Sequence, residues 1–109
     1  MSDAEEALAF QLRAVGIPFE REFVFAAPRR WRADFVVTAT RGGAPVPVWA
    51  FLVEVDGGAF VGGRHSTGTG MEKDAEKQSA AAIAGYRVIR CTPRQVESGE
   101  CLRWIEAAR

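Results

Sequence analysis

Three acidic residues lie inside or directly after apolar runs that are typical of β-strands. Asp34 lies within the run 31–40, Glu54 lies near the end of the run 48–55, and Asp56 follows two residues later. An ionised carboxylate is costly to bury in a strand unless a cation pairs with it or binds it. Side chains two apart in a strand share a face, so Glu54 and Asp56 can converge on one ion. A hairpin between the two strands would let Asp34 face them.

Hard oxygen ligands gathered in this way favour Mg²⁺, or Mn²⁺ in its place, over zinc. The sequence therefore predicts a metal site made by Asp34, Glu54 and Asp56. The alternative is structural: Asp34 pairs with Arg32 or another cation, and Asp56 only begins the turn at its two following glycines. The joint placement of the three carboxylates favours the metal site over that alternative.

Basic residues near these carboxylates could contact a polyanion. Arg29, Arg30 and Arg32 form a local cluster, and Arg64 with His65 lies in a glycine-rich segment that could fold over a phosphate. The alternatives are a solvated basic face and an exposed loop histidine. The formal net charge is zero and the pI is about 6.6, so any contact with DNA must be local rather than a general coating.

Lys77 is the candidate cation on the predicted helix 72–84. Residues 74, 77, 78 and 81 share one face of a predicted helix, so Lys77 should lie on the side of that helix that looks towards Glu54. A solvated face of glutamates and lysines is the alternative.

These side chains must be positioned by a small α/β domain. The 109 residues suit one domain, and 48% hydrophobic with 26% charged residues is ordinary for a folded protein. The predicted elements follow the order α-β-β-β-α-β-α: helix 3–15, strands 22–26, 31–40 and 48–55 with a hairpin connection at 41–47, a mobile loop 57–70, helix 72–84, strand 86–91, and a final helical region from 93, capped by Thr92 and broken at Gly99.

No apolar run approaches the length of a membrane span, and the acidic start MSDAEEALAF is unlike a secretory signal. We therefore expect no membrane contact and a location in the cytoplasm of a bacterial or phage-infected cell. Cys91 and Cys101 form neither a CxxC pair nor a disulfide framework, so two free thiols are expected. Nothing in the chain indicates an organic cofactor.

The order of these acidic positions resembles the PD-(D/E)XK nuclease superfamily. The segments RRWRADF, VEVDGG, GGRH and DAEKQ before AGYRVIR are similar to phage-type VRR-NUC and Vsr-like endonucleases, and the resemblance spans nearly the whole chain. It implies a restriction-endonuclease-like mixed sheet flanked by helices, and Mg²⁺-dependent cleavage of DNA. It also implies that Asp34 and Glu54 hold the metal and that His65 and Lys77 lie near the phosphate.

Within the first helix, the resemblance implies that an acidic residue adds a metal ligand or orients a metal-bound water. Glu5 lies three residues before Leu8 and so near the inward stripe, whereas Glu6 is rotated off it by about 100°. Glu5 is therefore the expected residue. The chain departs from the family at Asp56, where a lysine is usual, and Lys77 would have to replace that lysine.

The expected function is thus a metal-dependent endonuclease acting on DNA, including structured or branched DNA. Two alternatives stay open: a nuclease-like fold that grips DNA without cutting it, and an interaction subunit that works with a larger partner. A homodimer would suit the cutting of two strands, since each small chain carries one site.

Overall fold

The structure is a computed structural model, and it describes residues 3–25, 31–41, 44–56 and 68–109. The chain forms four helices and four strands within these ranges. They are α1 (Asp3–Ala14), β1 (Phe19–Val24), β2 (Arg32–Arg41), β3 (Ala44–Val55), α2 (Gly68–Ile83), β4 (Arg87–Cys91), α3 (Pro93–Glu97) and α4 (Glu100–Ala108).

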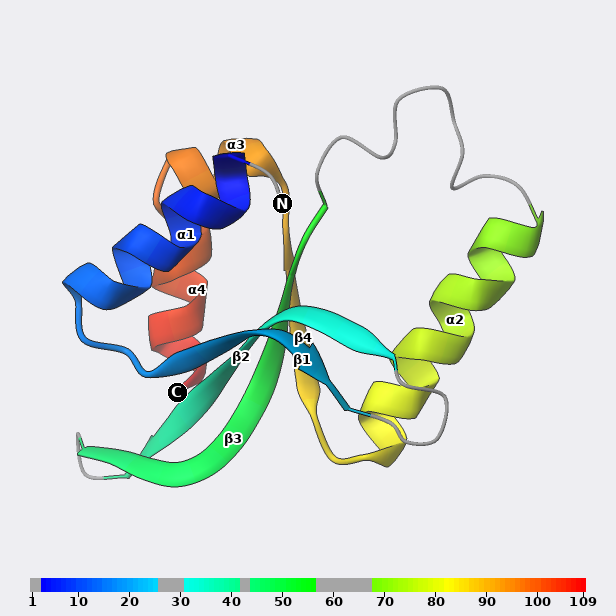
Figure 1. Cartoon of the computed structure of the whole chain (residues 1–109), viewed down its shortest axis with the longest axis horizontal. Coiled ribbons are helices and arrows are strands. Elements are labelled where there is room, and N and C mark those ends of the chain that lie inside the picture. Colours follow the sequence, from blue (N-terminus) through cyan, green and yellow to red (C-terminus); the bar gives the residue numbers. More distant parts are fainter. Residues whose placement is uncertain (1–2, 26–30, 42–43, 57–67) are drawn as a thin grey trace.

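The four strands form one mixed sheet in the order β1-β2-β3-β4. The first three strands are antiparallel neighbours, and β4 lies parallel to β3 after the crossover through α2. Helices α1, α3 and α4 cover one face of the sheet, and α2 lies on the other (Figure 1). The chain is therefore a mixed α/β domain with a helix-flanked sheet, as predicted.

Glycines end two of the helices where the sequence predicts a stop. Gly16 and Gly85 both have positive φ, 76° and 92°, which only glycine adopts at little cost. The amides that follow turn back to the last helical turn, with Ile17 donating to the Leu12 carbonyl at 3.0 Å and Tyr86 to the Ala81 carbonyl at 2.9 Å. This geometry lets the chain leave each helix directly into a strand.

The C-terminal helical region is divided at Gly99, as predicted. Thr92 is the N-cap of α3 and shares a capping box with Gln95, and Pro93 occupies the first turn. Gly99 then adopts φ 86° between α3 and α4. Gln11 of α1 donates to the Val96 carbonyl of α3 at 3.0 Å, so α3 is also attached to α1.

Two apolar clusters lie on opposite faces of the sheet. The larger cluster joins α1, α3 and α4 to the sheet and contains Leu8, Leu12, Phe35, Phe51 and Ile105, all fully buried. The smaller cluster lies beneath α2 and contains five buried residues: Phe25, Ala33, Val36, Leu52 and Ala81. Most of the apolar burial is therefore on the face away from α2.

The strand boundaries differ from the sequence prediction at the start of β1 and at the start of β3. β1 begins at Phe19, three residues before the predicted start. The expected connection 41–47 is mostly strand, because β3 begins at Ala44 and pairs Pro45 with Thr40. Proline is tolerated there because β4 pairs with β3 only from Phe51 onward, so no strand that the structure describes lies on the second side of this part of β3.

Helix α2 starts four residues earlier than predicted. Residues 68–70, assigned to the mobile loop, form its first turn, while 57–67 lie outside the described residues. A glycine costs a helix only about 1 kcal/mol relative to alanine, and amides of the first turn need no helical partner. The run of helix formers that follows therefore suffices to extend the helix.

The prediction of two free thiols is wrong. Cys91 at the end of β4 and Cys101 in α4 form a disulfide, with their Cα atoms 5.9 Å apart. The short helix α3 turns the chain back on itself, which brings the two cysteines within bridging distance.

Among the residues that the structure describes, no helix combines the length and the apolar character needed to cross a membrane.

Candidate functional site

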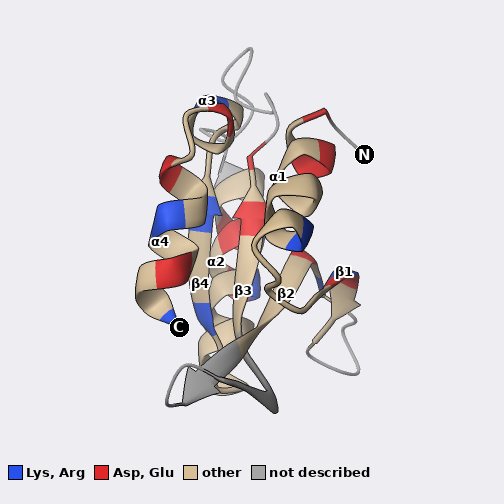
Figure 2. Ribbon diagram, turned by 90° about the vertical axis from the view of Figure 1, so that its left-hand side faces the viewer, with Lys and Arg blue, Asp and Glu red and all other residues tan. Residues whose placement is uncertain are grey.

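A row of charged residues crosses the sheet at one level. The register places Asp34 of β2 between Glu22 of β1 and Glu54 of β3, and it pairs Glu54 with Arg90 of β4. Figure 2 shows acidic positions of the central strands side by side, next to a basic position of β4. The predicted hairpin between the strands of Asp34 and Glu54 is present, so the two carboxylates are neighbours across the ladder.

Side chains replace part of the backbone ladder between Asp34 and Glu54. The amide of Val55 donates to Asp34 Oδ2 at 2.7 Å, and the amide of Asp34 approaches Glu54 Oε2 at 3.4 Å. Each carboxylate is thus attached to the backbone of the other strand or close to it. These contacts fix the two acids where the strands end.

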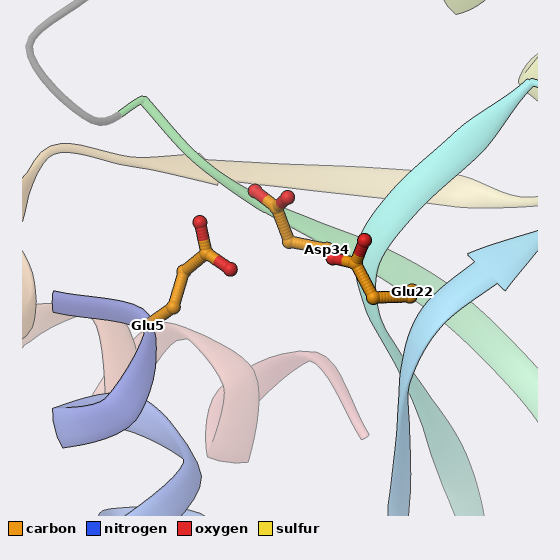
Figure 3. Close-up of side chains that lie close together, drawn as sticks. All are labelled: Glu5, Glu22 and Asp34. Carbon is orange, nitrogen blue, oxygen red and sulfur yellow. The ribbon is translucent and has the colours of Figure 1, made fainter. Parts of the chain in front are cut away.

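A compact group of three carboxylates lies beside this pair. Glu5 reaches from the first turn of α1 towards the strands, where it meets Asp34 of β2 and Glu22 of β1 (Figure 3). One oxygen of each lies within 4.8 Å of the others. Oxygens bound to one ion at about 2.0–2.6 Å can be no more than about 4–5 Å apart, so the group fits a single hard cation.

Glu5, rather than Glu6, faces the site, as the helical spacing predicts. The Glu5 side chain is 14% exposed and the Glu6 side chain 52% exposed. Burial, together with the neighbouring charges of Asp34 and Glu22, raises the pKa of Glu5 above its ordinary value. A cation among these acids would oppose that repulsion.

Glu22 belongs to this group of carboxylates but was not predicted from the sequence. It is a non-glycine residue with positive φ, 54°, and this conformation belongs to the strand segment next to Asp34. An acid at the start of the predicted strand 22–26 was the only available signal. Its position beside Asp34 depends on the register between β1 and β2, which the sequence does not reveal.

Two arginines partly balance these acids. Arg21 forms an ion pair with Glu6 at 2.9 Å and approaches Glu5 at 3.9 Å. Arg32, expected to contact nucleic acid, lies 3.6 Å from Glu22 and is largely exposed. Of the two partners that the structural alternative offered for Asp34, Arg32 or another cation, Arg32 thus lies beside Glu22 instead. The other expected contacts, Arg29, Arg30, Arg64 and His65, lie outside the described residues.

Lys77 lies on the face of α2 that looks towards Glu54, as the spacing predicts. Its Nζ is 2.5 Å from Glu54 Oε1. Burial raises the pKa of Glu54, and the hydrogen bond and charge of Lys77 act in the opposite direction. Glu54 is therefore a poorly solvated acid whose ionised form depends on a neighbouring cation. A catalytic role for Lys77 remains a prediction.

A cavity of about 130 Å³ lies between α2 and the sheet. The predicted helix face contributes all four of its residues to the lining. The polar part of the lining comes from β4, α2 and the end of β3: Glu54, Asp56, Asp74, Lys77, Gln78 and Arg90. Glu54 and Asp56 thus share a face, as expected of residues two apart in a strand.

Asp56 contacts β4 and is not part of the group of carboxylates that could hold a metal ion. Its Oδ1 accepts a hydrogen bond from Arg90 Nη2 at 3.0 Å, and its amide donates to the Cys91 carbonyl at 2.8 Å. The group of carboxylates that fits a cation contains Asp34 but neither Glu54 nor Asp56. Arg90 was also missed; an arginine inside the apolar run YRVIR was the available signal.

Comparisons with protein-family models, with curated proteins and with solved structures gave no match. The resemblance to the PD-(D/E)XK superfamily therefore remains a prediction from the sequence.

Proposed function

We propose that this chain is a metal-dependent nuclease that hydrolyses phosphodiester bonds in DNA. The observation that carries the proposal is the meeting of carboxylates from three elements, Glu5 of α1, Glu22 of β1 and Asp34 of β2, beside the Glu54–Lys77 pair. Four acids and one lysine gathered from two helices and three strands are more than a solvated surface requires, since Asp34 and Glu54 also contact the backbone of each other's strand.

The order of the elements supports the finer assignment to a restriction-endonuclease-like fold. An N-terminal helix precedes an antiparallel meander, and a crossover helix leads to a fourth, parallel strand. The resemblance implies the same order. It also implies that the acids lie on the first helix and on the second and third strands, as Glu5, Asp34 and Glu54 do.

The residues present fit Mg²⁺, with Mn²⁺ as a substitute, because their ligand atoms are all carboxylate oxygens. Asp34, with Glu5 and Glu22, would hold the ion, and Glu54 would lie beside this group on the neighbouring strand as the partner of Lys77. A bound ion would polarise the phosphate and lower the pKa of a coordinated water. Asp34 keeps its orientation through the Val55 amide, so the ligand does not have to be ordered when the ion arrives.

Lys77 would take the part of the lysine that is absent at position 56. Its ammonium already lies at Glu54, so a phosphate near that carboxylate would be within its reach. A positioned cation stabilises the charge that grows on the phosphate oxygens in the transition state. Asp56, held by Arg90, would support the site from the β4 side rather than bind the ion.

Cleavage of a panel of labelled DNAs tests the proposal. Duplex, single-stranded and branched DNA, with an RNA strand for comparison, should be incubated with Mg²⁺, with Mn²⁺ and with EDTA. We expect cleavage of at least one DNA that requires the metal and is lost in Asp34→Asn. Binding without cleavage under every condition would contradict the proposal and favour the inert DNA-binding module. Light scattering of the same samples measures whether the active form is the proposed homodimer.

A further inference from the structure

The cavity under α2 is unusual because one side of it is apolar and the other is charged. Its apolar wall is made by Phe25, Leu52, Ala81 and Val88. Three of these four, all but Val88, are buried members of the smaller core cluster, so one wall of the cavity is formed by the core. A cavity with this lining suits a ligand that is itself flat, mostly apolar and edged with polar atoms.

The size of the cavity limits the ligand to about one ring. Its volume is about 130 Å³. An apolar cavity of roughly 150 Å³ in another protein accommodates benzene, so a single six-membered ring is the appropriate scale. A fused two-ring system would require the walls to move.

The polar side offers hydrogen-bonding groups of both kinds. The carboxylate of Asp74 accepts hydrogen bonds, and the amide of Gln78 both donates and accepts them. Lys77 and Arg90 are already paired with Glu54 and Asp56, so these four charges are balanced, and a neutral polar edge of a ligand fits beside them.

We propose that this cavity binds a pyrimidine base, with the ring against the apolar wall and its polar edge towards Gln78 and Asp74. The inference rests on the proposed function, because the cavity is lined by Glu54 and Lys77, which lie beside the candidate metal centre. A base can enter such a cavity only when it is unpaired. The substrate is then a nucleic acid with an unpaired pyrimidine next to the bond that is cut.

The test compares two single strands in EDTA, so that binding is measured without cleavage. One is a short strand of thymidines, and the other has the same number of phosphates but abasic sugars. We expect the thymidine strand to bind about tenfold more tightly to the full-length protein, which is the scale of one well-placed base. Equal affinity for the two strands would overturn the inference without the need for any variant.

A matched pair of substitutions on α2 locates the effect. Ala81→Leu fills the cavity from its apolar wall, whereas Ala82→Leu makes the same change at an exposed position of the same helix. In folded protein, checked by circular dichroism, Ala81→Leu should reduce the preference for thymidine to near one and Ala82→Leu should leave it unchanged. A folded Ala81→Leu protein that keeps the full preference would overturn the inference.

Free thymidine separates the base from the strand that carries it. It should shift the methyl resonances of Val88 in the wild type but not in Ala81→Leu, while binding more weakly than the strand. Shifts confined to residues outside the cavity would count against the site.

Metal-dependent cleavage without a preference for bases would overturn this inference alone. A preference for bases without cleavage in Mg²⁺ or Mn²⁺ would overturn the nuclease proposal alone. Absence of binding to either strand would overturn this inference and count against the proposed function as well.

Discussion

The two faces of the sheet differ in the side chains that cover them. The face under α1, α3 and α4 is filled by fully buried apolar side chains and carries the disulfide. The face under α2 has a small apolar cluster, two ion pairs and a cavity. The contrast indicates that stability is concentrated on one side of a thin domain, which leaves the other side free to keep charges and empty space that a core would exclude.

The strongest test of this contrast is a truncation on each face. Phe35→Ala removes a fully buried ring from the larger cluster and should lower the free energy of unfolding by about 3–5 kcal/mol. Val88→Ala, at the cavity wall, should cost about 1 kcal/mol or less, because its side chain is only partly packed. Urea denaturation measures both. Equal losses on the two faces would remove the distinction.

Asp34→Asn should reduce DNA cleavage by about 10²- to 10³-fold, or about 3–4 kcal/mol at the transition state. Asparagine keeps an oxygen that can accept from the Val55 amide, so folding should survive. Single-turnover cleavage in Mg²⁺ gives the rate. Glu106→Gln, on an exposed position of α4, is the control and should cleave normally. An unchanged rate for Asp34→Asn would remove this residue from the site.

Lys77→Ala should slow single-turnover cleavage by about 10²-fold or more through loss of a positioned charge. Because Lys77 is the partner of the poorly solvated Glu54, the variant should also lose some stability at neutral pH, so the rate is measured in protein shown to be folded by circular dichroism. Lys73→Ala, at an exposed position of α2, is the matched control. If Lys77→Ala and Lys73→Ala cleave equally fast, Lys77 is only surface charge.

Opening the disulfide tests the covalent part of the stable face. Cys101→Ala should lower the free energy of unfolding by about 2–3 kcal/mol, the range for a bridge that closes a short loop, here with a sequence separation of 10. Reduction of the wild type by a dithiol should give a similar loss in urea denaturation. Oxidised and reduced protein with the same midpoint would show that the bridge does not support this face.

The smallest expected effect is on the pKa of Glu54. Lys77 lowers this pKa against the effect of burial, so Lys77→Met should raise it further. A raised pKa means that the folded protein holds the proton more tightly. The contribution of Glu54 to the stability of the fold is therefore present below its ordinary pKa of 4.5 and is lost as the pH rises through the raised pKa. NMR titration of the carboxyl carbon without metal measures the shift. An identical titration in both proteins would show that the ion pair is not formed in solution.

Local spacing predicted the parts of the site that lie within one element. The positions of Glu5 and Lys77 follow from helical periodicity, and the break at Gly99 follows from the conformational freedom of glycine. Glu22 and Arg90 could not be found in this way, because their places depend on which strands become neighbours and in what register.

The wrong predictions about the fold, the connection at 41–47 and the two free thiols, have the same cause. Pro45 is acceptable in β3 because, within the described ranges, only β2 pairs with that part of the strand, and this is a property of the whole sheet. Cys91 meets Cys101 only because α3 reverses the chain. Propensity and spacing describe what a segment prefers, whereas these features depend on contacts between segments.

The bridge between Cys91 and Cys101 has a consequence for the geometry of the acids. It closes a ring of chain that contains α3, and α3 is attached to α1 through the contact between Gln11 and Val96. The N-terminal turn of α1 holds Glu5 in place beside Asp34. A covalent restraint on the same face of the sheet as α1 thus limits the movement of Glu5, the proposed metal ligand from that helix. If the ring were open, the loss of alignment would appear as weaker metal affinity before any loss of folded structure.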